Sequence, residues 1–203
     1  MTSRELKNNL DSLRALDADL DRALDQYGYP EPRPVRQGFD ALLRIIVSQQ
    51  ISKEAATSIF KKVETEIGSI DPRALESASD EALRNCGMSA RKVEYARNLA
   101  RSVLSGDLDF GKMKRWSDEE VVKKIQSLRG LGRWSAEIFL MFGLGRKDIF
   151  AADDLALRVA LSKLKRKRKQ MTPDQCRKAA QHWSPHRTSG CIFLWHYYRG
   201  APQ

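Results

Sequence analysis

Two adjacent carboxylic acids follow a short apolar run in the last third of the chain. Residues 149–152 (IFAA) are apolar, and Asp153 and Asp154 come directly after them, at the start of a predicted helix over residues 155–164. An acid at a helix start usually caps the N–H groups exposed there, and we expect Asp153 to do so. Two adjacent acids need not do the same job, so these residues alone leave the role of Asp154 open.

A glycine-rich string, LRGLGRWSA, runs from Leu128 to Ala136. Its two glycines, Gly130 and Gly132, separate an apolar helical stripe that ends at Leu128 from an apolar run over residues 136–142. This pattern predicts a helix, a hairpin and a second helix, with a turn tighter than a Cβ atom would permit. Such a turn presents consecutive backbone N–H groups at the start of the second helix, where the helix dipole favours an anion.

Two polar side chains of the same string fit an anion site. Arg133 supplies a cation and Ser135 a hydroxyl at the start of the second helix, so we expect a phosphate clamp that reads no base sequence. The alternative is an ordinary glycine-containing connection between antiparallel helices. The nine residues taken together favour the clamp.

The positive charge of the chain is unevenly distributed. The 203 residues include 36 Lys and Arg against 26 Asp and Glu, a net charge of +10. The last 43 residues hold 10 basic residues and one acidic residue, so almost all of the excess lies there. This distribution indicates a surface that faces a polyanion. A solvated face with a basic loop at residues 165–169 is the alternative, and composition does not decide between them.

Composition also argues against several classes of protein. No stretch approaches about 18 uninterrupted apolar residues, and the N-terminus is charged every few residues, so neither a membrane span nor a classical secretion signal is expected. The cysteines are too few and too far apart for a zinc or iron–sulfur site, and the histidines lack further ligands, so no metal is expected. We expect reduced, mostly buried thiols in a cytoplasmic protein. The residues concerned are Cys86, Cys176, Cys191, His182, His186 and His196.

Helix signals recur along the chain, whereas strand signals are almost absent. Apolar residues repeat at helical spacing, for example over residues 39–47, and residues 1–36 read as one amphipathic helix. Regularly capped helices joined by short loops predict an all-α protein, either one domain or two small lobes sharing a core. The predicted caps are Ser52, Asp71, Ser79, Ser89, Ser117 and Thr172.

Three segments resemble the helix-hairpin-helix DNA glycosylase superfamily, and within it the 3-methyladenine DNA glycosylase II (AlkA-like) branch. LRGLGRWSA is similar to the family hairpin, and FAADDLALR to the segment that carries its catalytic Asp. GFDALLRIIVSQQISKEAATSIF is similar to an early helix pair with a Gln-Gln turn. Together with the tail around Trp195, the resemblance covers roughly residues 37–199.

The resemblance implies an all-α, two-lobed helix-hairpin-helix DNA glycosylase fold that occupies residues 1–203 without the N-terminal β domain of larger members. Lobe one would span about residues 37–130, and lobe two about residues 1–36 plus 131–203. DNA would lie across the cleft, with the damaged nucleotide rotated out of the stack.

Aligned residue by residue, the resemblance assigns roles to particular side chains. Asp154 falls on the catalytic position, Trp134 and Trp195 on aromatic positions of the base pocket, and Ile138 where some relatives have a pocket Tyr. The implied DNA contacts are the hairpin residues Gly130, Gly132, Arg133 and Ser135, the turn Gln49-Gln50, the wedge region with Met88 and Ala90, and Arg187. For Gln49-Gln50, simple loop solvation is the alternative.

The implied reaction is hydrolysis of the N-glycosidic bond of alkylated purines, chiefly 3-methyladenine with 7-methylguanine as a second candidate, leaving an abasic site. A carboxylate near the sugar stabilises the oxocarbenium-like transition state, and tryptophan faces favour a cationic base. Relatives that also cut the backbone carry a Lys where this chain has Trp134, so no lyase activity is expected.

The implied partner is double-stranded DNA with alkylated bases, bound by a monomer in the cytoplasm or, in a eukaryote, the nucleus. No cofactor is expected beyond a monovalent cation held by the hairpin carbonyls. Two other functions remain open. One is a non-catalytic helix-hairpin-helix DNA-binding protein, and the other is a glycosylase of the same fold for oxidised or deaminated bases.

Overall fold

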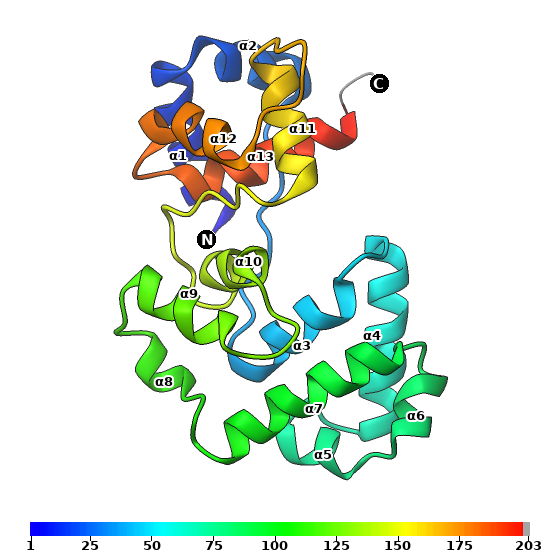
Figure 1. Cartoon of the computed structure of the whole chain (residues 1–203). Helices are drawn as coiled ribbons and strands as arrows, with labels where there is room; N and C mark the ends of the chain where they lie inside the picture. The colour runs from blue at the N-terminus through cyan, green and yellow to red at the C-terminus, as the bar shows by residue number, and fades with distance from the viewer. Residues whose placement is uncertain (201–203) are drawn as a thin grey trace. The chain divides into compact units, whose positions relative to one another are not determined.

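Every regular element in the part of the chain that the structure describes, residues 1–200, is a helix (Figure 1). The coordinates are a computed structural model, and they confirm the predicted all-α class. The chain divides into two units. Met1–Val35 and the chain from Gly145 onward form one, here called the Asp154 unit, and Arg36–Leu144 form the other, here called the hairpin unit. None of the helices in residues 1–200 combines the length and apolar character that crossing a membrane requires.

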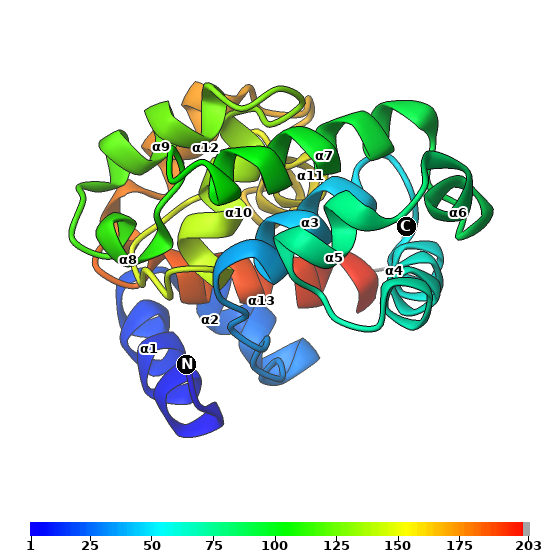
Figure 2. The ribbon, with the colours of Figure 1, turned by 90° about the horizontal axis from the view of Figure 1, so that it is seen from below.

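The hairpin unit holds eight of the helices within residues 1–200. In this unit α7 packs against α3 and α5, and α10 packs against α9 and α3 (Figure 2). Its core includes Leu42, Ile46 and Leu99, which lie on the predicted apolar faces and are at most 1% exposed. The helices are α3 (Gly38–Ser48), α4 (Lys53–Ile67), α5 (Pro72–Ser77), α6 (Asp80–Asn85), α7 (Ala90–Leu104), α8 (Phe110–Met113), α9 (Asp118–Gln126) and α10 (Arg133–Phe142).

The predicted helix caps are confirmed at the side-chain level. Each cap residue accepts a hydrogen bond from a backbone N–H group of the first turn, which satisfies a donor that the helix itself leaves unpaired. Ser117 and Thr172 form complete capping boxes, with Glu120 and Gln175 reaching back to the cap backbone. The caps are Ser52, Asp71, Ser79, Ser89, Ser117 and Thr172.

Helix α10 belongs to the hairpin unit, whereas the sequence placed the crossing between lobes near residue 130, ahead of it. Phe139 in α10 is fully buried, and its ring lies 5.9 Å from the ring of Phe110 in the same unit. The backbone of Arg36 also donates to Phe142 at the end of α10 (2.8 Å). The apolar face of α10 therefore completes this core, and the chain crosses between units after Leu144.

The Asp154 unit is built around α13 (Arg187–Gly200). It packs against α11 (Leu155–Leu164), α1 (Ser3–Leu16) and α2 (Ala18–Tyr27) (Figure 1). The remaining helices of this unit within the described residues are α12 (Pro173–Ala179) and the 3-10 helix η1 (Gln181–Trp183). Residues 188–195 of α13 are all buried, so α13 is the central helix of this unit.

The prediction of one amphipathic helix over residues 1–36 is wrong. Asp17 adopts an extended backbone (φ −141°, ψ 98°) and separates α1 from α2, and its side chain accepts the N–H groups of Asp19 and Leu20 as the N-cap of α2. The break exposes Leu16 (56%), while Leu13 and Leu20 on either side are fully buried. A cap in mid-pattern therefore overrides the continuous leucine periodicity.

The Asp17 carboxylate also connects three distant parts of its unit. Its side chain is 1% exposed and accepts Lys165 Nζ (2.6 Å) and the indole N–H of Trp183 (2.7 Å). Burial by itself would raise the pKa of Asp17, but the hydrogen bonds from Lys165 and Trp183 outweigh it and hold the pKa below its ordinary value. Lys165 is thus a structural residue, and only residues 166–169 form the exposed basic loop.

We predict that Asp17→Asn lowers the free energy of unfolding at pH 7 by about 3 kcal/mol, because it leaves Lys165 without its buried counter-charge. The folded pKa is depressed, so the stabilisation is complete above the ordinary value of 3.8 and is lost as the pH falls through the lowered pKa. Urea unfolding at pH 7 and pH 3 measures this difference.

The matched control is Asp25→Asn, because the Asp25 side chain is 67% exposed in its ion pair with Arg14. We expect a change within about 0.5 kcal/mol there. Equal losses in the two variants, or a loss for Asp17→Asn that does not shrink in acid, would contradict the structural role of Asp17.

Candidate active site

Asp154, not Asp153, is the N-cap of α11, so the expected cap was misplaced by one residue. Asp154 Oδ1 accepts the backbone N–H of Leu157 (3.0 Å), three residues on, as an N-cap does. Asp153 is exposed and forms an ion pair with Arg177 on α12 (3.4 Å). Because an N-cap accepts from the N–H groups two or three residues on, the start of α11 decides which acid serves.

The same Asp154 oxygen accepts a second hydrogen bond, from the indole Nε1–H of Trp195 on α13 (3.2 Å). The two donors come from different helices, so α11 and α13 together fix the orientation of the carboxylate. The structure thus brings together two of the predicted residues of this unit, Asp154 and Trp195.

A third residue, which the sequence analysis did not single out, completes this group. The Arg33 guanidinium carbon lies 4.1 Å from the centre of the Trp195 ring, so the cation stacks on the indole face. Burial, followed by repulsion from Arg199, lowers the pKa of Arg33 to about 10, and attraction to Asp154 partly opposes the shift. The only sequence signal was the position of Arg33 between Pro32 and Pro34.

The predicted hairpin lies between α9 and α10 in the hairpin unit. Gly130 has φ +85°, and a Cβ atom there would lie 2.2 Å from the Tyr95 ring, so both the backbone conformation and the available space require glycine. Gly132 is the N-cap of α10 and contributes no side-chain cap. Gly132 therefore does not cap the backbone N–H groups in the first turn of α10. An anion site at a helix start uses N–H groups that no side chain caps.

The two polar side chains of the hairpin already have structural roles. Arg133 donates from Nε to Glu137 one turn further along α10 (3.0 Å), and Ser135 is 2% exposed. Their contacts with phosphate stay predictions.

Gln49 contacts the hairpin from the α3–α4 turn, and its predicted contact with DNA stays a prediction. Its amide Nε2 donates to the carbonyl oxygen of Gly130 (2.9 Å). Just before this turn, Lys92 Nζ of α7 donates to the carbonyl of Val47 in the last turn of α3 (2.7 Å). Gln50, next to these anchors, is exposed and has a left-handed backbone (φ 58°). The chain is thus anchored at Val47 and Gln49, directly before the exposed Gln50.

The remaining predicted residues of the hairpin unit differ in exposure. Trp134 and Ile138 are half-buried and lie one turn apart on α10, so they share a helix face. Ala90 is exposed at the start of α7, whereas Met88 is 3% exposed and lacks the exposure that a plug in DNA needs. The pocket and wedge roles of these residues stay predictions.

Arg187, the first residue of α13, is paired within the chain. Its guanidinium donates to both carboxylate oxygens of Asp148 (2.7 and 2.8 Å). This forked contact is the main cause that holds the pKa of Asp148 below its ordinary value. The predicted contact of Arg187 with phosphate is not tested by this arrangement.

We predict that Gly130→Ala lowers the free energy of unfolding by at least about 2 kcal/mol, because alanine would be strained at this φ and would clash with Tyr95. Gly132→Ala is the matched control, since a Cβ atom at Gly132 would have nothing within 4 Å. It should cost less than about 1 kcal/mol. Denaturant unfolding of both variants tests the difference, and similar losses would refute it.

Relatives of known name share both the sequence and the fold. The DNA-3-methyladenine glycosylase 1 of Schizosaccharomyces pombe is 31% identical over 164 residues, covering 79% of this chain and 72% of that protein. The crystallised 3-methyladenine DNA glycosylase of the same yeast, in complex with abasic DNA, superposes with a TM-score of 0.85 at 29% identity, covering 93% of this chain and 95% of that one.

A DNA-3-methyladenine glycosidase from Bacillus halodurans superposes with a TM-score of 0.77 at 32% identity and covers 95% of this chain and 89% of that one. The family model described as "HhH-GPD superfamily base excision DNA repair protein" matches residues 43–186, which include the hairpin and Asp154. This match and the relatives agree with the predicted family. The chain belongs to the HhH-GPD superfamily of base excision DNA repair proteins.

Proposed function

We propose that this protein is a monofunctional DNA glycosylase of base excision repair that hydrolyses the N-glycosidic bond of alkylated purines, chiefly 3-methyladenine, and leaves an abasic site. The observation that carries the proposal is the Asp154 carboxylate, fixed by the N–H of Leu157 and the indole of Trp195. The relatives named above for 3-methyladenine support the substrate class.

Asp154 acts by electrostatics on the sugar. Loss of the base leaves positive charge on C1′ and the ring oxygen, and a carboxylate held nearby stabilises that charge without having to reorient. A full charge at about 4 Å in an effective dielectric of about 20 contributes about 4 kcal/mol, or about a thousandfold in rate. The same carboxylate can orient the attacking water.

The leaving base of an alkylated purine needs little further help. An N3- or N7-alkylated purine is already cationic and departs as a neutral molecule, so no general acid is required. The face of Trp134 would bind such a base by stacking and by cation–π attraction. Ile138, one turn from Trp134, would then line the same pocket.

The hairpin supports duplex DNA as the partner. The N–H groups at the start of α10 would bind one phosphate, with Arg133 and Ser135 beside it, and the hairpin carbonyls would hold a monovalent cation. One of these carbonyls, that of Gly130, already accepts from Gln49. The complex of the yeast relative with abasic DNA supports DNA binding by this chain, which we propose acts as a monomer in the cytoplasm or nucleus.

The gap left by an extruded base would be filled from the hairpin unit. Gln50 and Ala90 are exposed, and the Gln50 turn is anchored at Gln49 and Val47, which makes Gln50 the longer and better supported plug. Arg187 would reach a phosphate only by giving up part of its contact with Asp148. The proposed glycosylase function does not depend on these roles.

We predict that Asp154→Asn lowers the rate of 3-methyladenine release by at least about a thousandfold, because the negative charge is lost. Asparagine is as good an N-cap as aspartate and still accepts from Trp195, so folding and duplex binding should persist. Single-turnover release of bases from methylated DNA, identified by chromatography, measures the effect.

Asp153→Asn is the matched control, since Asp153 is the neighbouring acid, is exposed and forms an ion pair with Arg177. It should keep base release within about threefold of the wild type, as surface changes usually do. Near-normal release by Asp154→Asn would refute the catalytic role. Binding without release by the wild type would instead favour the non-catalytic DNA-binding protein, and release of only oxidised or deaminated bases would favour the third function.

We also predict that the product is an intact strand with an abasic site. A lyase needs an amine to form a Schiff base with the sugar, and the hairpin position that carries Lys in bifunctional relatives is Trp134 here. Borohydride added during the reaction should therefore trap no covalent protein–DNA adduct, and strands should break only after alkali treatment. A trapped adduct would show that another lysine supplies this chemistry.

A further inference from the structure

Arg33 contacts the Trp195 indole, and the mechanism above does not use it. Its guanidinium stacks 4.1 Å from the centre of the Trp195 ring, and the indole N–H of that ring binds Asp154 (3.2 Å). The cation of Arg33, the indole of Trp195 and the carboxylate of Asp154 are thus linked by successive contacts within the Asp154 unit.

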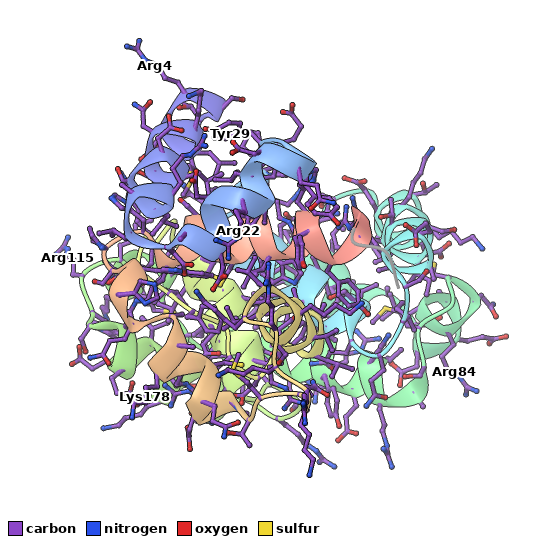
Figure 3. The ribbon with its side chains drawn as sticks, turned by 90° about the horizontal axis from the view of Figure 1, so that it is seen from above. Arg4, Arg22, Tyr29, Arg84, Arg115 and Lys178 are labelled. Atoms are coloured by element: carbon purple, nitrogen blue, oxygen red, sulfur yellow. The ribbon has the colours of Figure 1, made fainter. Side chains whose placement is uncertain are left out.

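The chain holds Arg33 in place before any ligand binds. Pro32 and Pro34 flank it, and a residue that precedes proline is confined to extended conformations, so Arg33 loses little backbone entropy here. Upstream, Tyr29 lies beside α1 (Figure 3), where its hydroxyl donates to Asp11 and accepts from Arg14. The segment is therefore tethered at Tyr29 and at Trp195.

Arg33 remains charged in the range where DNA repair enzymes work. Desolvation and the neighbouring Arg199 lower its pKa only to about 10, so the guanidinium stays protonated near neutral pH. Arg33 covers one face of the Trp195 indole, and Trp195 as a whole is only 7% exposed. Any base that stacks near Trp195 therefore meets a positive charge at short range.

We propose that Arg33 is a specificity-determining residue that shifts base release away from cationic alkylpurines and toward neutral damaged bases. The proposal rests on the proposed glycosylase function and concerns the same site. It identifies neutral purine lesions, of which hypoxanthine is the simplest probe, as substrates beside the cationic ones.

The direction follows from the charge on the departing base. With a cationic purine, the reacting nucleotide carries a positive charge both in the ground state and in the transition state, so Arg33 repels it throughout. With a neutral purine, bond cleavage moves the electron pair of the glycosidic bond onto the base, which becomes negative as the sugar becomes positive. A cation on the base side and Asp154 on the sugar side then stabilise both developing charges.

The test is the ratio of kcat/KM for two lesions in one duplex sequence, 7-methylguanine as the cationic base and hypoxanthine as the neutral one. Arg33→Gln removes the charge and keeps a planar polar group. We expect the ratio to shift toward 7-methylguanine by at least about tenfold, since both the repulsion and the assistance disappear. Arg33→Lys keeps the charge and should hold the ratio within about threefold of the wild type.

Arg4→Gln is the matched control for net charge, because Arg4 is exposed and points away from α1 into solvent (Figure 3). It should leave the ratio unchanged. Circular dichroism and thermal melting of each variant confirm that the fold persists.

The outcomes separate this proposal from the one it rests on. Equal losses for both lesions in Arg33→Gln would show a purely structural role and overturn the proposal, as would a shift toward hypoxanthine. Measurable wild-type release of 7-methylguanine with none of hypoxanthine would overturn it too. Failure of the wild type to release either base would instead refute the glycosylase function itself.

Discussion

The rest of the proposed mechanism depends on one hydrogen-bonded carboxylate, that of Asp154. Its Oδ1 atom accepts from the first turn of α11 and from Trp195 on α13, so a single oxygen joins the two helices that form the centre of its unit. A charge that must stabilise a transient cation is effective only if it is already oriented. The hydrogen bond that caps α11 also orients the carboxylate. Asparagine would make the same cap but would not carry the charge.

The core of the Asp154 unit maintains this arrangement from the far side. Asp17 ends α1, caps α2 and binds both Lys165, just after α11, and Trp183 in η1. Trp183 in turn packs against Gly190 of α13 so closely that a Cβ atom there would lie 2.5 Å from the ring. A buried charge with several donors and a tight glycine contact together fix where α11 and α13 lie within the unit.

In the hairpin unit, neighbouring residues hold backbone groups in place in the same way. Gly130 permits the left-handed turn, Tyr95 fills the space that a side chain would need, and Gln49 binds the Gly130 carbonyl. A phosphate site made of backbone N–H groups gains no adaptability from side chains, so its geometry has to be fixed by its neighbours. The side chains expected to assist, Arg133 and Ser135, are instead engaged with Glu137 or buried.

Local signals in the sequence determined the helices, most of their caps, the glycine hairpin and the acid pair, because each depends on residues within one turn of one another. The predicted N-cap of α11 was wrong by one residue, Asp153 in place of Asp154, since the cap depends on where α11 starts. Tertiary structure alone decided the contacts of Asp17 with Lys165 and Trp183, the contact of Gln49 with the hairpin and the stacking of Arg33 on Trp195. These contacts join residues far apart in the chain, and no local pattern specifies which distant partners the packed core brings together.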